Sequence, residues 1–223
     1  MMRTTSHSGD IIYIYKHGAT QATRTLPAPN SAYSCAVDPR SRDLAVTTEV
    51  STVAIYRHSR GTPQVYPAHS FTGYPAYDDA GNLYLARPAG GYYEVAVLTN
   101  GTLHSIKFDQ EIFGLVHLQW LDGLLVVTTH AHGGSQNYHQ DVYAIQINGS
   151  YQGHVVQSLA LDRKNREEPP KTPVDWVEGD ALMAPGHNRG ALDFWNYPGG
   201  GDPERSVRLE LVDGYFTGMV MSP

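Results

Sequence analysis

Histidines are the residues of this chain whose number and spacing point most clearly to chemistry. Of the 11 histidines in 223 residues, five fall in segments that connect predicted strands on one side of the fold: His7, His130, His132, His139 and His187. Neutral imidazole binds divalent transition metals and transfers protons near neutral pH. In an extended segment, His130 and His132 carry their rings on the same side, about 6–7 Å apart. The pattern predicts a divalent-metal site with the ligands His7, His130, His132 and His187.

A carboxylate ligand for this site would come from Glu49, Asp10 or Asp141, which occupy connections of the same kind. A second interpretation stays open, because histidines are also common in polar loops, where they are solvated or hydrogen-bonded without binding a metal.

His117 and Asp175 form a second candidate for chemistry. Aligning the opening strands of five similar segments places these residues at one position: Ala36, Ala76, His117, Asp175 and Val220. A polar residue in an apolar position is costly unless it is paired or faces water. We expect His117 and Asp175 to contact each other, either as a catalytic base with its orienting carboxylate or as a structural pair that joins two neighbouring sheets.

Aromatic and amide side chains on the same side of the fold suggest a ligand pocket. The candidate ligand-binding residues are Glu49, Tyr74, Tyr92, Tyr138 and Asn188. Aromatic rings present flat apolar faces on which sugar rings stack, and Tyr also supplies a polar hydroxyl. Packing between sheets uses aromatic residues too, so both roles stay open for the tyrosines.

The elements that must position these residues follow from an internal repeat. Self-alignment gives a unit of about 40 residues, a period typical of the four-stranded blades of a β-propeller. The predicted blades span about residues 33–71, 72–112, 113–170, 171–212, and 213–223 together with 1–32. Strands such as Ile11–Tyr15 and Thr52–Tyr56 show the required apolar patterns, and Asn-Gly turns support antiparallel pairing. The sequence therefore predicts an all-β chain that forms a single five-bladed β-propeller, closed into a ring when its C-terminal strand joins the N-terminal strands.

Two turn segments carry a family resemblance. Asp38-Pro39 followed by Leu44-Ala45-Val46, and residues 78–85 (DDAGNLYL), resemble the core of NHL-type and lactonase-like propeller repeats. The resemblance implies a propeller blade and no particular activity.

Composition limits the classes of partner. The net charge is −6, with 16 basic and 22 acidic residues, so nucleic acid is not expected as a ligand. No apolar run reaches the length of about 20 residues that a membrane-spanning helix needs. Cys35, the only cysteine, is expected to be a small buried apolar residue. Residues 1–7 do not resemble a signal peptide, which favours a cytoplasmic protein, or a secreted or periplasmic one if a leader has been removed.

Two functions are consistent with these patterns. One is a metal-assisted hydrolase or lyase acting on a small molecule or carbohydrate in a histidine-rich pocket. The other is a non-catalytic propeller that binds a carbohydrate, a small molecule or a protein. A monomer is expected in either case.

Overall fold

The computed structural model describes residues 2–3, 11–15, 22–28, 30, 32–68, 73–89, 92–129, 137–164, 176–185 and 191–208. These residues form β-strands, turns and one short 3₁₀ helix, η1 (Arg57–Ser59). The prediction of an all-β chain is confirmed. Within the described residues, no helix has the length and apolar character needed to cross a membrane.

The strands of the described ranges form five sheets, which are numbered in chain order. The first contains β1 (Met2–Arg3), β2 (Ile11–Tyr15) and β3 (Ala22–Pro27), and the second contains β4 (Ala32–Val37), β5 (Leu44–Thr48), β6 (Thr52–Tyr56) and β7 (Gln64–Pro67). The third contains β8 (Pro75–Tyr77), β9 (Leu83–Ala89), β10 (Tyr92–Thr99) and β11 (Thr102–Ser105). The fourth contains β12 (Lys107–Phe108), β13 (Leu115–Leu121), β14 (Leu124–Thr129), β15 (Asn137–Ile147) and β16 (Gln152–Lys164). The fifth contains β17 (Trp176–Glu178), β18 (Ala181–Pro185), β19 (Ala191–Asn196) and β20 (Arg205–Arg208).

Consecutive strands pair in antiparallel fashion within every sheet, and the predicted strands Ile11–Tyr15 and Thr52–Tyr56 are β2 and β6. The exception is β12, which pairs in parallel with the outer edge of β16 through Lys107↔Gln152 and Phe108↔Gly153. Because consecutive antiparallel strands reverse direction, the connections between first and second strands lie at one end of a sheet. The connections between second and third strands lie at the other end, which we call the connection face.

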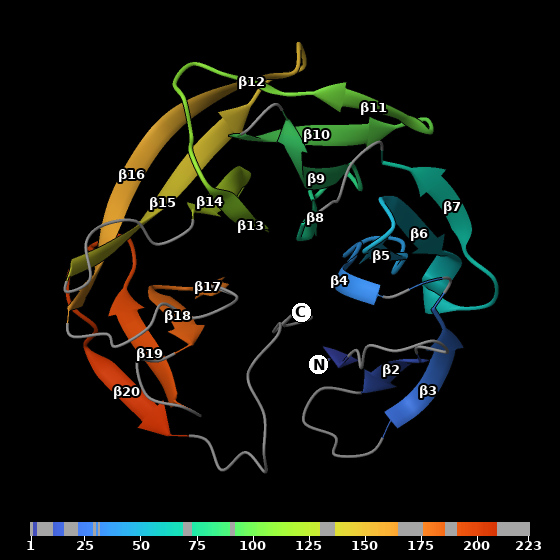
Figure 1. The fold of residues 1–223 in the computed structure, drawn as a ribbon, viewed down its shortest axis with the longest axis horizontal. Helices are drawn as coiled ribbons and strands as arrows, with labels where there is room; N and C mark the ends of the chain where they lie inside the picture. The colour runs from blue at the N-terminus through green and yellow to red at the C-terminus, as the bar shows by residue number, and fades with distance from the viewer. Residues whose placement is uncertain are drawn as a thin grey trace.

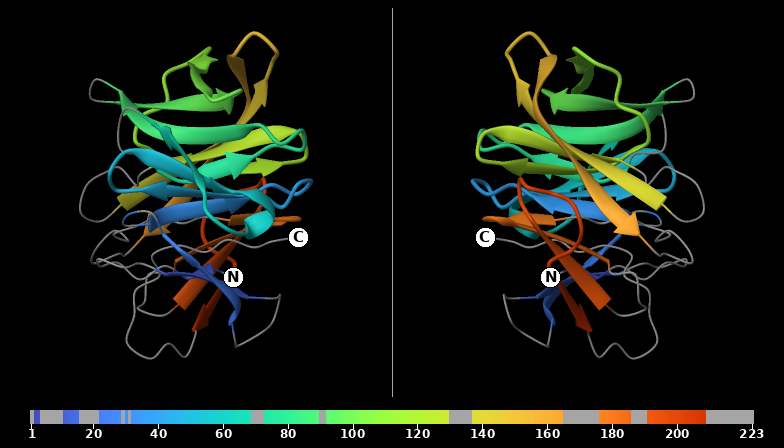
Figure 2. Two further views of the ribbon diagram at one scale, coloured as in Figure 1. Left: turned by 90° about the vertical axis from the view of Figure 1, so that its right-hand side faces the viewer. Right: turned by 90° about the vertical axis from the view of Figure 1, so that its left-hand side faces the viewer.

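Successive sheets follow one another around a common centre, with β4, β8, β13 and β17 closest to it (Figure 1). The outermost strands of the second to fifth sheets are β7, β11, β12 and β20, with β16 directly inside β12. Side views show the same succession, with the long hairpin of β15 and β16 crossing the side of the molecule diagonally (Figure 2). The described part of the first sheet has three strands, and residues 213–223, which were predicted to complete it, lie outside the described residues. Closure of a five-bladed ring therefore stays a prediction.

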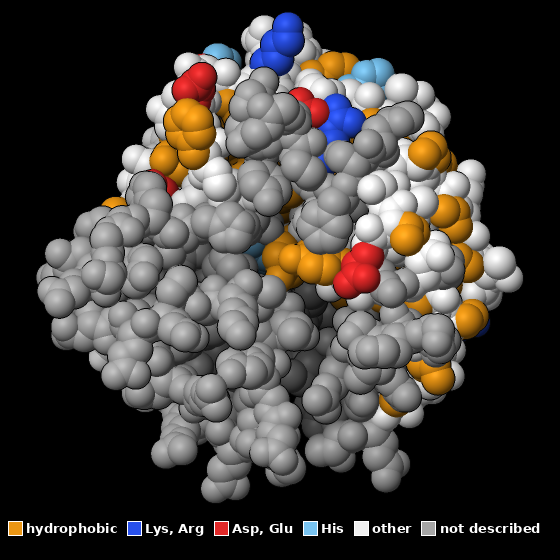
Figure 3. Space-filling model, viewed as in Figure 1, with side chains coloured by type: hydrophobic (Ala, Val, Ile, Leu, Met, Phe, Trp, Pro, Cys, Tyr) orange, Lys and Arg blue, Asp and Glu red, His pale blue; other side chains and the backbone are white. Residues whose placement is uncertain are grey.

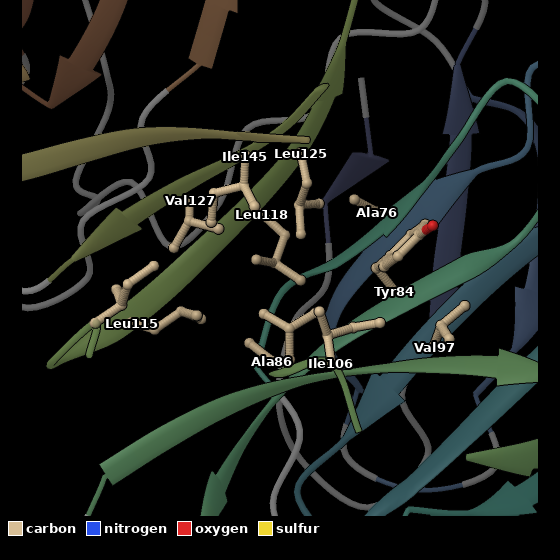
Figure 4. Close-up of a cluster of buried hydrophobic side chains, with 12 residues drawn as sticks. Ala76, Tyr84, Ala86, Val97, Ile106, Leu115, Leu118, Leu125, Val127 and Ile145 are labelled. Atoms are coloured by element: carbon tan, nitrogen blue, oxygen red, sulfur yellow. The ribbon is translucent and has the colours of Figure 1, made fainter. Parts of the chain in front are cut away.

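In the described part of the chain, four hydrophobic clusters lie between neighbouring sheets and hold them together. Between the third and fourth sheets, Tyr84 and Ala86 on one side pack with Leu118 and Val127 on the other (Figure 4). A sheet between two others must bury both faces, so its strands are apolar at nearly every position instead of at alternate ones. Leu44 and Val46 of β5 accordingly face the first sheet, and Ala45 belongs to the cluster shared with the third.

Cys35 is buried in the cluster between the first and second sheets, as predicted. Burial raises the pKa of its thiol to about 12, so the reactive thiolate does not form near neutral pH.

The residues that carry the family resemblance serve the turn between the first and second strands. Buried Asp78 accepts hydrogen bonds from the backbone N–H groups of Ala80 and Asn82 at 2.9 and 2.8 Å, and from the Asn82 side chain at 2.8 Å. Gly81 has φ +85, and a Cβ there would lie 3.1 Å from the Asp38 carboxylate of the preceding sheet. The motif is thus explained by turn geometry and by close packing between sheets.

Gln119 joins the fourth and fifth sheets through its side-chain amide. Its Nε2 donates to the carbonyl of Val177 at 2.6 Å, and its Oε1 accepts from the N–H of the same residue at 2.8 Å. Gln119 is buried, so these bonds satisfy polar groups on both sides of the contact.

Candidate functional site

Three rings form a row across the second, third and fourth sheets, at the connection-face end of the innermost strands. Tyr33 and Tyr74 have ring centroids 5.6 Å apart with planes tilted by 52°. Tyr74 and His117 follow at 5.2 Å in an edge-to-face arrangement of 67°. We call Tyr33, Tyr74 and His117 the aromatic row. Such tilted and edge-on contacts are favourable for aromatic rings, so the row is a stable element that links three sheets.

The strand registers explain how the row is positioned. A β-bulge interrupts the pairing of β4 with β5 between Ala32 and Ser34, and another interrupts β13 with β14 between Leu115 and His117. An extra residue in one strand bends it and redirects its side chains. Tyr33 is the extra residue of β4. Its side chain therefore does not follow the alternation of side chains along the rest of that strand.

The same registers correct the sequence alignment. Ser34 pairs with Thr47 and His117 pairs with Thr128, each directly after its bulge. The alignment of His117 with Ala36 is therefore wrong by two residues, and Ser34 is the equivalent of His117. The shift arises in the turn that follows, because six residues separate the paired Val37 and Leu44, whereas four separate the equivalent pair Trp120 and Leu125. An alignment that keeps this spacing constant misses the difference of two residues.

Tyr74 occupies the corresponding position of the third sheet. It directly precedes Pro75, which pairs with Leu85, as Ser34 directly precedes Cys35, which pairs with Val46. A polar side chain thus stands at this position in three successive sheets.

His117 is buried, with 4% of its surface exposed. Burial lowers the pKa of its imidazole to about 4, because the charged form loses its hydration. His117 is therefore neutral at neutral pH and can act as a hydrogen-bonding group. A conjugate acid with so low a pKa makes a weak general base at that pH. Its proposed partner, Asp175, lies outside the described residues, so the His117–Asp175 pair stays a prediction.

Glu49 is exposed on the connection face, in the turn between β5 and β6. It follows Thr48, which pairs with Ala32, so Glu49 and Tyr33 belong to the same end of the second sheet. The turn is held by a 2.7 Å hydrogen bond between the hydroxyls of Thr48 and Thr52. Seen along the direction of Figure 1, hydrophobic side chains gather near the centre of the molecule beside acidic ones (Figure 3).

A threonine side chain also forms a hydrogen bond at the connection-face end of the fourth sheet. Thr129, the last residue of β14, accepts a 3.1 Å hydrogen bond from the N–H of Asp141. The Asp141 carboxylate, a predicted alternative metal ligand, accepts a hydrogen bond from the Tyr143 hydroxyl at 3.4 Å. Burial of the phenol, followed by the negative charge of Asp141 and this hydrogen bond, raises the pKa of Tyr143.

Several predicted site residues lie where the structure does not describe them. Those outside the described residues are the four proposed metal ligands, one proposed ligand-binding residue and one proposed catalytic residue: His7, His130, His132, His187, Asn188 and Asp175. Tyr92 lies in strand β10, and Tyr138 lies in strand β15. Within the described parts of the chain, no group of three or more His, Cys, Asp and Glu side chains is arranged to hold a metal ion. The metal site stays a prediction.

Gln119 is the structurally important polar residue that the sequence reasoning missed. The sequence did contain a signal for it, because Gln119 and His117 are the two polar residues of the strand LVHLQWL, whose other residues are apolar. A polar residue in such a strand requires a partner. The partner is a backbone group of another sheet, which no side-chain pattern reveals.

Comparison with known proteins assigns the chain to no family. No family model matches the chain, and no curated protein matches it significantly. The function is therefore argued from the geometry of the site.

Proposed function

We propose that the chain is a five-bladed β-propeller that binds a carbohydrate or a similar small polar molecule at its connection face without transforming it. The proposal combines the arrangement of the sheets with the aromatic row at the inner strands. The resemblance of residues 78–85 to NHL-type repeats also supports the propeller.

Support for the propeller comes from the shared cores. Each described sheet packs on its neighbour in chain order, and the innermost strands surround one centre (Figure 1). A succession of this kind leaves the outer faces of the first and last sheets uncovered unless they meet. In the proposed fold, residues 213–223 add the missing strand to the first sheet and join the ends.

Deletion of residues 215–223 tests ring closure. The shortened chain is expected to lose its cooperative unfolding transition, because the first and fifth sheets would no longer be held together. A shortened chain that unfolds at the same temperature as the full chain would refute the five-bladed ring.

The single observation that carries the binding proposal is the aromatic row. Tyr74 and His117 are buried and fixed by their ring contacts, and they support Tyr33, which is half-buried. A partly exposed ring held rigidly in this way offers a stacking face with little loss of conformational freedom on binding. We place a sugar ring on the exposed part of Tyr33.

Glu49 supplies the polar contact that such a site needs. Its exposed carboxylate accepts hydrogen bonds, and its turn is fixed by the Thr48–Thr52 contact. Binding sites for small molecules commonly combine an apolar or aromatic surface with a few polar groups that set the orientation of the ligand. Neutral His117 fits a binding role better than a role in base catalysis at neutral pH.

A glycan array followed by titration of the best ligand tests this proposal. Tyr33→Ala is expected to weaken binding about fivefold, corresponding to roughly 1 kcal/mol of lost ring contact. Tyr66→Ala is the matched control, because Tyr66 is also half-buried in the second sheet but lies in its outermost strand, β7. Equal losses in the two variants, or no binding by the wild type across the array, would refute the proposal.

A further inference from the structure

Five exposed arginines gather around the second sheet, at the end opposite to the connection face. They come from β3, from the turn between β4 and β5, and from the segment that contains η1: Arg24, Arg40, Arg42, Arg57 and Arg60. We call them the arginine surface. Five of the 16 Lys and Arg residues of the chain therefore share one surface, although the chain as a whole carries a charge of −6.

Hydrogen bonds tie the three segments together. The Ser59 hydroxyl donates to the Arg42 carbonyl at 2.8 Å, and an Arg24 guanidinium N–H donates to the Ser59 carbonyl at 3.0 Å. The His58 Nδ1 lies 2.7 Å from the carbonyl oxygen of Ser41. The arginines are thus attached to one connected piece of backbone.

The carboxylates within this cluster are already engaged. Asp43 is buried and accepts hydrogen bonds from the Arg57 guanidinium at 2.6 Å and from the His58 N–H at 2.8 Å. Asp38 is buried as well and accepts from the Arg40 N–H at 2.9 Å. The neighbouring turn of the third sheet, where the Arg40 guanidinium donates to the Ala80 carbonyl at 3.3 Å, adds Asp78 and Asp79. Asp78 is bonded within its own turn, and Asp79 accepts from the Trp120 Nε1 at 2.9 Å. These four carboxylates are thus engaged and fewer than the five arginines. Among the described residues, the guanidinium groups of Arg42 and Arg60 form no ion pair.

Three residues in the segments that carry the arginines have strained backbone conformations, and a buried carboxylate stabilises them. Arg42, His58 and Ser59 have φ values of 59, 50 and 53, in the left-handed region that residues other than glycine seldom adopt. Strain of this kind persists where surrounding contacts enforce it, and it is frequent at binding sites. Asp43 enforces it here, because it binds the N–H of His58.

We propose that the arginine surface is a docking site for a short acidic segment of another protein. Arginine is the cation best suited to this role, because its planar guanidinium group makes paired hydrogen bonds to a carboxylate. Val65, which is 47% exposed in the adjacent β7, supplies an apolar contact for a hydrophobic side chain of the same segment. A polysaccharide has no side chain of that kind.

Two observations favour a short acidic segment over a long polyanion. Charges beyond about 8 Å are largely screened at physiological ionic strength, so a short segment senses the local arginines, whereas a long polyanion also meets the acidic remainder of the molecule. Single-stranded nucleic acids additionally require exposed rings for base stacking. The tyrosines nearest to this surface, Tyr66 and Tyr77, are half-buried and buried.

Fluorescence anisotropy with the full chain tests the proposal. The probe is a fluorescein-labelled glutamate-rich peptide with a central leucine, and the control probe has glutamine in place of every glutamate. The wild type is expected to bind the first probe, with affinity that falls as salt is added, and not the second. Removal of each unpaired arginine is expected to weaken binding about two- to fivefold, the range of exposed ion pairs.

The variants are chosen so that they fold. Arg42→Asn keeps a residue that tolerates a positive φ, and Arg60→Gln changes a side chain outside the Asp43 network. Arg205→Gln is the matched control, since it removes the same charge from the fifth sheet, where the guanidinium lies 4.0 Å above the Phe194 ring. Unchanged melting temperatures confirm that each variant is folded.

Three results would overturn the proposal. The first is equal loss of affinity in Arg205→Gln and in the double variant Arg42→Asn/Arg60→Gln. The second is tighter binding of a heparin oligosaccharide or of polyuridylate RNA than of the acidic peptide. The third is no measurable binding of the acidic peptide at low salt.

Discussion

Replacing Gln119 with leucine should weaken the contact between the fourth and fifth sheets. The Gln119 amide is the partner of both the N–H and the carbonyl of Val177, at 2.8 and 2.6 Å. Leucine has similar length and no polar atoms, so both backbone groups would be left buried without these partners. Each unsatisfied group costs about 1–3 kcal/mol, and the added apolar contact returns roughly 1 kcal/mol.

The expected net loss is about 3 kcal/mol in the free energy of unfolding, measured by urea denaturation. It corresponds to a fall of roughly 10 °C in melting temperature for a chain of this size. Gln146→Leu is the control, because Gln146 is exposed in β15 of the same sheet. That change should alter the free energy of unfolding by less than about 0.5 kcal/mol.

Gln119→Glu distinguishes the hydrogen bonds from packing. A carboxylate can accept from the Val177 N–H but cannot donate to the Val177 carbonyl, so this variant should be less stable than the wild type at neutral pH. Protonation restores a donor, and the difference from the wild type should shrink as the pH is lowered. If Gln119→Leu is as stable as Gln146→Leu, the side-chain bridge does not contribute to holding these sheets together.

Three other measurements test the remaining features. The folded pKa of about 4 for His117 lies below its ordinary value of 6.5, so the unfolded chain binds the extra proton and stability should fall by roughly 2 kcal/mol between about pH 7 and pH 5. His117→Phe should lack this part of the pH dependence, and identical profiles would contradict the burial argument. Gly153→Ala should destabilise the fold by about 1–3 kcal/mol, because its Cβ would lie 2.6 Å from an aromatic ring carbon. Gly149→Ala, with open space around it, should be nearly neutral, and equal effects would argue against the tight contact. The predicted metal site requires that the purified protein bind a divalent transition metal and that the double variant His130→Ala/His132→Ala lose it. Elemental analysis that finds no metal in the wild type after incubation with zinc would refute that site.

Local pattern was sufficient to predict most of the strands. Strands such as Thr52–Tyr56 are apolar and β-branched over several residues and end at turn residues, and β6 has these bounds. The burial of Cys35 was predictable for the same reason, because an apolar strand between two sheets has no exposed face. The turn containing Asp78 was recognisable as well, since its carboxylate bonds to N–H groups within four residues along the chain.

The candidate site was predictable only in its residue types. His117 was selected as a polar residue in an apolar position and Tyr74 as a ligand-binding aromatic residue, and the structure places their rings 5.2 Å apart. The equivalence of His117 to Ser34 follows from the strand registers, because the turn after the first strand is two residues shorter in the fourth sheet than in the second. No residue type in these apolar strands marks that difference.

The sequence by itself determined the β-strands, the turns and the residues that must be buried, because these depend on neighbours a few positions away. Only the tertiary structure decided that Gln119 bridges to Val177, 58 residues along the chain, and that arginines from three segments share one surface. Contacts of this kind join backbone groups and exposed side chains of different sheets. They follow from how the sheets are placed around the centre, and no periodicity in the sequence encodes that placement.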